Sequence, residues 1–189
     1  VDEIQGIGAI LFICQLGTEG GNAFADVVSG KVTPSGKLTD TWAKKYADIP
    51  FHDEYSYLNG NVEDEYYKEG IYVGYRYFDS FDVEPCYPFG YGLSYTDFSI
   101  FGAGVSIDGT RVNLAASVTN IGANYSGKEV AQVYLSAPAG KLHKEYQSLV
   151  AFAKTKELAP AESETLQMSF DMKEVASYDE ERASYVLEP

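Results

Sequence analysis

The apolar residues of this chain follow two different spacings, one before and one after residue 95, and this change limits the folds available to it. Residues 9–15 form an apolar run of strand length. A glycine-rich turn at residues 17–21 follows, and residues 22–28 then have the apolar spacing of a helix. Strand, glycine turn and helix in this order predict an α/β layer, in which a continuous apolar strand is buried on both faces.

Turn residues and a long irregular stretch follow this helix. We predict that Gly30 ends the helix and that residues 34–36 form a turn. Residues 43–70 are polar, aromatic and only weakly periodic. They predict a long ordered loop rather than a regular element, and loops of this length are often functional.

Short alternating stretches appear from Phe98 onward. Apolar and polar residues alternate at 112–118, 129–135 and 165–170, and turn residues separate these stretches at 108–109, 120–122 and 160–162. Period-two strands at this spacing predict an antiparallel β-sandwich. We therefore expect two domains, residues 1–96 in an α/β layer and residues 97–189 in a β-sandwich.

Charge and composition exclude several kinds of partner. The chain has 189 residues, of which 45% are hydrophobic, and a net charge of −14. An anion of this size repels phosphate backbones, so we expect no nucleic-acid partner. It has no basic amphipathic face and no apolar stretch of about 18 residues, so we expect no membrane partner either. Neutral sugars meet no electrostatic penalty on such a surface.

The cysteine and histidine residues do not favour a metal site. Cys14 lies in the apolar run, which predicts a buried free thiol, and Cys86 is far from it in sequence. His52 and His143 are the only histidines, and no CxxC motif is present, so a zinc site is not expected.

Three features of the sequence suggest a function, but each can also be explained without one. The turn at residues 17–21 could cradle a phosphate, but it lacks a GKS or GKT ending and carries Glu19, which repels anions. Arg76 lies among tyrosines, where a guanidinium stacks on rings and pairs with an acid, and we expect a structural role for it. Residues 124–126 (NYS) form a glycosylation sequon, relevant in a secreted eukaryotic protein.

An acidic run within the long loop is the remaining candidate for chemistry. Its members are Glu63, Asp64, Glu65 and Glu69. Glycoside hydrolysis needs two carboxyl groups on opposite sides of the scissile bond, about 5–5.5 Å apart in a retaining enzyme. Sequence cannot identify such a pair within a run of acids, and a solvated loop face is the interpretation that we favour.

Several long motifs of the chain are specific enough to suggest a family. Residues 17–28 (GTEGGNAFADVV) and 34–38 (PSGKL) are similar to the GxEGGNAxADVLxG and NPSGKL motifs of family 3 glycoside hydrolases. Residues 67–79 (YKEGIYVGYRYFD) resemble YxEGIYVGYRYYD, and residues 88–98 (PFGYGLSYTDF) resemble PFGYGLSYTxF. These motifs occur in the order that they have in the family.

The second half resembles the fibronectin type III-like domain of the same family. Residues 118–122 (VTNIG) with 127–134 (GKEVAQVY) are similar to VxNTGxxxGxEVVQLY, and residues 144–152 are similar to the KELxGF segment. The resemblance implies the second half of an α/β sandwich domain, followed by an immunoglobulin-like sandwich. We expect both ends of the chain to be internal positions and the sandwich to be truncated at its C-terminus.

The resemblance also implies a retaining hydrolysis of β-linked glycosides that uses no cofactor. In the family an Asp nucleophile comes from a (β/α)8 barrel, and the general acid/base Glu lies ahead of the GxEGG segment. Neither has a counterpart here, so we assign no catalytic and no metal-binding residue, and the substrate-binding residues stay unknown.

Two readings of function follow from this resemblance. In the first, the chain supports the active site of a β-glucosidase-like enzyme, residues 52–70 approach the substrate cleft, and the isolated chain is inactive. A β-glucoside or oligosaccharide and the missing barrel domain are then its partners. The alternative is a non-catalytic carbohydrate-binding or domain-interaction module.

Overall fold

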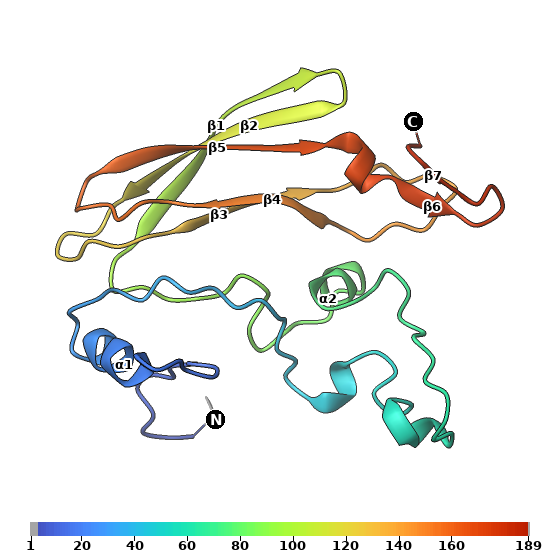
Figure 1. Cartoon of the computed structure of the whole chain (residues 1–189), viewed down its shortest axis with the longest axis horizontal. Helices are drawn as coiled ribbons and strands as arrows, with labels where there is room; N and C mark the ends of the chain where they lie inside the picture. The colour runs from blue at the N-terminus through green and yellow to red at the C-terminus, as the bar shows by residue number, and fades with distance from the viewer. Residues whose placement is uncertain (1–3, 189) are drawn as a thin grey trace.

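A computed structural model describes residues 4–188 apart from the side chain of Tyr57. Figure 1 shows an N-terminal half with little regular structure, which lies along one side of a β-sandwich. The helices of this half are α1 (Gly20–Val28) and α2 (Tyr75–Ser80), together with two short 3-10 helices at Tyr46–Asp48 and Ser56–Asn59. The long loop is therefore irregular apart from these two single turns, as predicted.

Helix α1 confirms the predicted helix and its end. Gly30 follows the C-cap with φ +76°, the left-handed conformation that glycine adopts without strain, and its N–H donates to the carbonyl of Val27. At the other end a Cβ on Gly20 would lie 2.2 Å from the Cβ of Leu16. Glycine at this position therefore allows the apolar segment to pack against the start of α1.

The predicted strand at residues 9–15 is wrong in this structure, and so is the predicted burial of Cys14. Residues 7–14 have no regular structure, and Cys14 is exposed, with φ +48°. A strand of a parallel sheet is defined by hydrogen bonds to its neighbours, and the described part of the chain supplies none for this run. Residues 9–15 therefore have the sequence pattern of a strand but lack the hydrogen bonds to neighbouring strands that would make them one.

The predicted turn at residues 34–36 is also wrong, because this segment has neither a turn nor any other regular structure. The residues after it pair with residues 87–91: the N–H groups of Leu38 and Trp42 each donate over 2.8 Å to the carbonyls of Tyr91 and Tyr87. Trp42 also packs edge-on against Phe12 and Tyr87, with ring centroids 5.0 and 5.9 Å away. Trp42 thereby holds the apolar N-terminal segment against the rest of this half.

The second half forms the predicted antiparallel sandwich. One sheet has the order β1-β2-β5 and the other the order β3-β4, and a separate hairpin is formed by β6 and β7. The turn Asp108-Gly109 joins β1 to β2, with Gly109 at φ +60°. The strands are β1 (Phe98–Asp108), β2 (Arg111–Asn120), β3 (Val130–Leu135), β4 (Ser148–Lys154), β5 (Ser163–Asp171), β6 (Ser177–Asp179) and β7 (Ser184–Val186). A last 3-10 helix, Met172–Val175, follows β5.

The core lies between the two sheets. Val118 and Leu158 are fully buried, and Ala116, Ala131 and Met168 pack with them. Apolar burial of this kind supplies most of the stability of a sandwich. Strand β1 does not contribute to this core in the same way. Its residues Ile100, Val105 and Ile107 lie opposite residues on the buried face of β2, but their own side chains are exposed.

Candidate functional site

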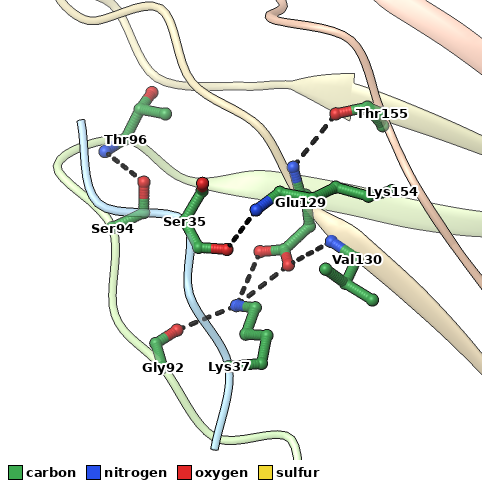
Figure 2. Close-up of polar contacts among 9 residues, drawn as sticks. All are labelled: Ser35, Lys37, Gly92, Ser94, Thr96, Glu129, Val130, Lys154 and Thr155. Atoms are coloured by element: carbon green, nitrogen blue, oxygen red, sulfur yellow. Dashed lines mark hydrogen bonds and ion pairs between the residues drawn. The ribbon is translucent and has the colours of Figure 1, made fainter. Parts of the chain in front are cut away.

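Lys37 joins the N-terminal half to the sandwich. Its ammonium lies 2.9 and 3.0 Å from the two carboxylate oxygens of Glu129, and it donates to the carbonyl of Gly92 over 2.8 Å (Figure 2). The two charged side chains are only 18% and 13% exposed. Nearby, the Lys154 ammonium donates to the carbonyl of Ser35 over 2.8 Å. Three segments distant in sequence therefore meet at one charged contact.

Helix α2 makes a second junction with the sandwich, at the start of β4 and the segment just before it. The N–H of Leu149 donates to the hydroxyl of Tyr75 over 2.7 Å, and the N–H of Tyr146 donates to the hydroxyl of Ser80 over 2.9 Å. Figure 1 shows α2 beside the β3-β4 sheet. Burial, together with the nearby Tyr75 and Asp79, raises the pKa of the Tyr134 hydroxyl on this sheet.

Arg76 occupies the structural position that the sequence predicted. Its guanidinium carbon lies 5.9 Å from the centre of the Tyr75 ring, within the range of a cation–π contact. Its Nε lies 3.8 Å from a carboxylate oxygen of Glu145, which is an ion pair but too long for a hydrogen bond. Arg76 therefore stacks on a ring and faces an acid across the junction of α2 with residues 144–149.

The long loop forms a hollow of about 190 Å³ from its own residues. The two arms of the loop, residues 51–59 and 65–69, face each other across it. Four aromatic residues line it, namely Phe51, Tyr55, Tyr66 and Tyr67. Asn59 and four charged residues, Glu54, Glu65, Lys68 and Glu69, complete the lining. An aromatic wall with a few polar groups is the usual composition of a small-molecule site.

Side-chain contacts connect the two arms of the loop. The N–H of Ser56 donates to Glu65 Oε1 over 3.2 Å, and Lys68 forms an ion pair with Glu54. At the tip, the amide of Asn59 donates to the carbonyl of Asp64 over 3.0 Å. These contacts hold the hollow open without help from the sandwich.

The structure divides the acidic run that the sequence singled out. Glu65 and Glu69 line the hollow, whereas Glu63 and Asp64 belong to the turn around Asn61. The backbone N–H groups of these two turn residues donate to the Asn61 side-chain oxygen over 2.9 and 3.2 Å. The four tyrosine and phenylalanine rings of the lining were not predicted, although Phe51 lies only one residue outside the segment 52–70.

The remaining candidate residues lie apart from one another. His52 contacts the carbonyl of Ile49 through Nδ1 at 3.1 Å, and His143 and Asn124 are exposed. Cys86 is half-buried, whereas Cys14 is exposed. Within residues 4–188 no three His, Cys, Asp or Glu residues gather in a way that could hold a metal ion. No helix in that range is both long and apolar enough to cross a bilayer.

An ion pair near the C-terminus closes the loop before β4. Lys144 pairs with Glu188, and Glu188 also accepts from the N–H groups of Lys141 and Leu142 over 2.8 and 3.3 Å. The Lys144 ammonium and these N–H groups hold the pKa of the Glu188 carboxyl below its usual value.

Comparison with known families gives two matches along the chain. Residues 1–75 match the glycosyl hydrolase family 3 C-terminal domain, and residues 129–189 match a fibronectin type III-like domain. These matches agree with an α/β segment followed by a β-sandwich.

Curated relatives of the chain are β-glucosidases. A β-glucosidase of Ruminococcus albus is 45% identical over 173 residues, covering 91% of this chain and 18% of that protein. β-Glucosidase A of Butyrivibrio fibrisolvens is 39% identical over 208 residues, covering 96% of this chain and 24% of that protein. The chain thus spans about a fifth to a quarter of the length of these relatives.

Solved structures agree with this assignment. β-Glucosidase 3B of Thermotoga neapolitana, in complex with glycerol, superposes on 86% of this chain with a TM-score of 0.81 and 44% identity, covering 23% of that protein. The same enzyme has also been solved in complex with glucose, with a TM-score of 0.80 and 44% identity over 85% of this chain and 22% of its own. The chain therefore belongs to glycosyl hydrolase family 3 and contains that family's C-terminal domain followed by the fibronectin type III-like domain.

Proposed function

We propose that this chain is the supporting part of a retaining glycoside hydrolase that acts on β-linked glucosides or oligosaccharides. The catalytic barrel of that enzyme is not present in the chain. In this proposal the two junctions at Lys37 and α2 fix the α/β segment on the sandwich, so that its free side is presented to the barrel. The relatives of the chain, which are β-glucosidases, support the substrate class.

The observation that carries the proposal is the exposed apolar segment at residues 7–16. The side chains of Ile10, Phe12 and Leu16 are 46%, 58% and 46% exposed, and Ile7, Leu11 and Ile13 are similar. Soluble proteins rarely leave such a continuous apolar run uncovered. A strand that is buried on both faces of a parallel sheet has this composition, so other strands would cover it in the whole enzyme.

We also propose a domain boundary between residues 96 and 97. The first strand of the sandwich begins at Phe98, whereas the Tyr95 hydroxyl, just before the proposed boundary, donates to the carbonyl of Val27 in α1 over 2.9 Å. The proposed domains are therefore residues 1–96 and 97–189.

The isolated chain should not hydrolyse glycosides, because double displacement requires a nucleophile and a facing acid/base. Incubation of the purified chain with an aryl β-glucoside should release no phenol above the uncatalysed rate. Sustained turnover by the chain alone would contradict the proposal.

A chimera tests the supporting role directly. The matching 173 residues of the Ruminococcus albus β-glucosidase would be replaced by this chain. The chimera should hydrolyse an aryl β-glucoside, whereas the enzyme with that segment deleted should not. A folded chimera without activity would argue against the proposal and for the alternative.

The alternative is a non-catalytic carbohydrate-binding or domain-interaction module. The hollow at residues 51–69 favours it, because the chain builds that hollow without any other domain. The two functions differ in the chimera, since a module that had lost its catalytic role would not restore hydrolysis.

A further inference from the structure

We infer that the hollow at residues 51–69 is a sugar-binding site that takes one neutral hexopyranose unit. The choice of a β-glucoside unit as its ligand rests on the proposed function. The existence of the site rests on the hollow itself, which is made entirely by one loop of this chain.

The aromatic side chains suit the apolar face of a pyranose ring. Tyr55 and Tyr66 are each 62% exposed and Tyr67 is 85% exposed, yet all three line the hollow. A tyrosine ring offers an apolar face for the C–H groups of a sugar and a hydroxyl for its polar edge. None of these hydroxyls makes a hydrogen bond to another residue in the described part of the chain, so they are available to a ligand.

The carboxylates suit the hydroxyl groups of the same ligand. Glu69 has no hydrogen bond or ion pair through its carboxylate within residues 4–188, and Glu65 uses only Oε1, for the Ser56 N–H. Ionised carboxylates accept strong hydrogen bonds from hydroxyl groups. A sugar in the hollow would therefore meet acceptors that the protein itself leaves unused.

The charge of the hollow selects neutral sugars. Glu54, Glu65 and Glu69 against Lys68 give a formal charge of −2. This charge repels uronic acids and sugar phosphates, and Lys68 is already paired with Glu54. A volume of about 190 Å³ is on the scale of a single hexose rather than a longer oligosaccharide.

The loop is held in shape before any ligand arrives. Contacts between its arms at Ser56–Glu65 and Glu54–Lys68 fix the width of the hollow. Phe51 and Ser56 also adopt positive φ values of 54° and 57°, strained conformations that cluster at functional sites. A site formed in advance loses less entropy on binding.

Titration of the complete 189-residue chain with methyl β-D-glucopyranoside tests this inference. NMR shifts of residues 51–69 should saturate with a Kd on the order of 1 mM, as a small ligand in a shallow site allows. Tyr66→Ala and Glu69→Gln should each weaken binding by about tenfold. Two control variants should bind the glucoside as tightly as the parent does. Glu63→Gln changes a member of the same acidic run that lies outside the hollow. Tyr146→Ala removes a tyrosine that is 64% exposed but does not line the hollow.

A negatively charged sugar tests whether the charge of the hollow selects its ligand. Methyl β-D-glucuronide should bind several-fold more weakly than the glucoside at low salt. The absence of saturable shifts, equal affinity for the two ligands, or unchanged affinity in Glu69→Gln would each overturn the inference. An active chimera combined with any of these results would leave the supporting function standing, so the two proposals fail separately.

Discussion

The backbone of Gly92 lies so close to the carbonyl oxygen of Gly36 that a Cβ atom on Gly92 would be 2.2 Å from that oxygen. This close approach brings the segment before Leu38 against the segment before β1. Both segments reach the charged contact of Figure 2, where Lys37 donates to the carbonyl of Gly92. The absence of a side chain at position 92 therefore lets these two segments of the N-terminal half pack side by side, next to the contact between Lys37 and Glu129.

The substitution Gly92→Ala should destabilise the chain by about 1–3 kcal/mol, because backbone atoms cannot move aside as a flexible side chain can. Gly36→Ala is the matched control, since a Cβ there would meet nothing within 4 Å, and its effect should stay within about 0.5 kcal/mol. Urea unfolding followed by circular dichroism measures both. If Gly92→Ala and Gly36→Ala were equally stable, the backbone at Gly92 would not lie as close to the Gly36 carbonyl as described.

Loss of the Lys37 ammonium should destabilise the chain by about 1–3 kcal/mol, because Glu129 would keep a charge in a largely buried position. The variant Lys37→Met retains the length of the side chain and removes the charge. Lys31→Met removes an exposed pair with Asp26 and should cost less than about 1 kcal/mol.

A double-mutant cycle separates the pair from its surroundings. Combining Lys37→Met with Glu129→Gln should give a loss smaller than the sum of the single losses, by about 0.5–3 kcal/mol. Additive losses in urea unfolding would show that the two side chains act independently.

Removal of the Tyr75 hydroxyl tests the junction of α2. Tyr75→Phe keeps the ring contacts but leaves the N–H of Leu149 without its acceptor, which should cost about 1 kcal/mol. Hydrogen exchange at the Leu149 amide should become faster while most of the sandwich is unchanged. Unaltered exchange at that amide would mean that the hydroxyl does not hold the junction.

Acid should weaken the fold through two carboxylates. Glu188 has a lowered pKa because of Lys144 and the N–H groups of Lys141 and Leu142, and Asp171 because of the Lys173 N–H and the Thr110 hydroxyl. A group whose pKa is lowered by folding stabilises the protein above its ordinary pKa, about 4, and this stabilisation is lost as pH falls through the lower folded value.

The melting temperature should therefore decline as the pH falls below about 4. Glu188→Gln and Asp171→Asn should each make that decline shallower and lower the melting temperature at neutral pH. Thermal unfolding by calorimetry between pH 7 and 3 checks both statements. A variant with the same pH profile as the parent would show that its carboxylate does not contribute.

Strands with clear alternation could be predicted from the sequence, and strands with interrupted alternation could not. β2, β3 and β5 coincide with the alternating stretches. β1 was not delimited, because its register shifts between Gly102 and Gly104 and breaks the period of two. β4 (SLVAFAK) reads as a continuous apolar run, which does not distinguish a strand from a helix.

In the N-terminal half, the local sequence pattern does not determine whether a segment forms a strand. Residues 9–15 have the composition of a buried strand, but burial and hydrogen bonding come from neighbours that the described chain lacks. The hollow was missed for a related reason. The carboxylates of the loop stand out in the sequence, whereas the wall of the hollow is made by aromatic rings that approach only after the chain reverses near Asn59 and Gly60.

Trp42 gives this protein a natural optical probe. It is the chain's only tryptophan, it is half-buried, and its indole touches Phe12 of the apolar N-terminal segment. Binding of another domain over that segment would exclude water from the indole and shift its fluorescence to shorter wavelengths. Assembly with the proposed barrel domain could therefore be followed in real time without attaching a dye.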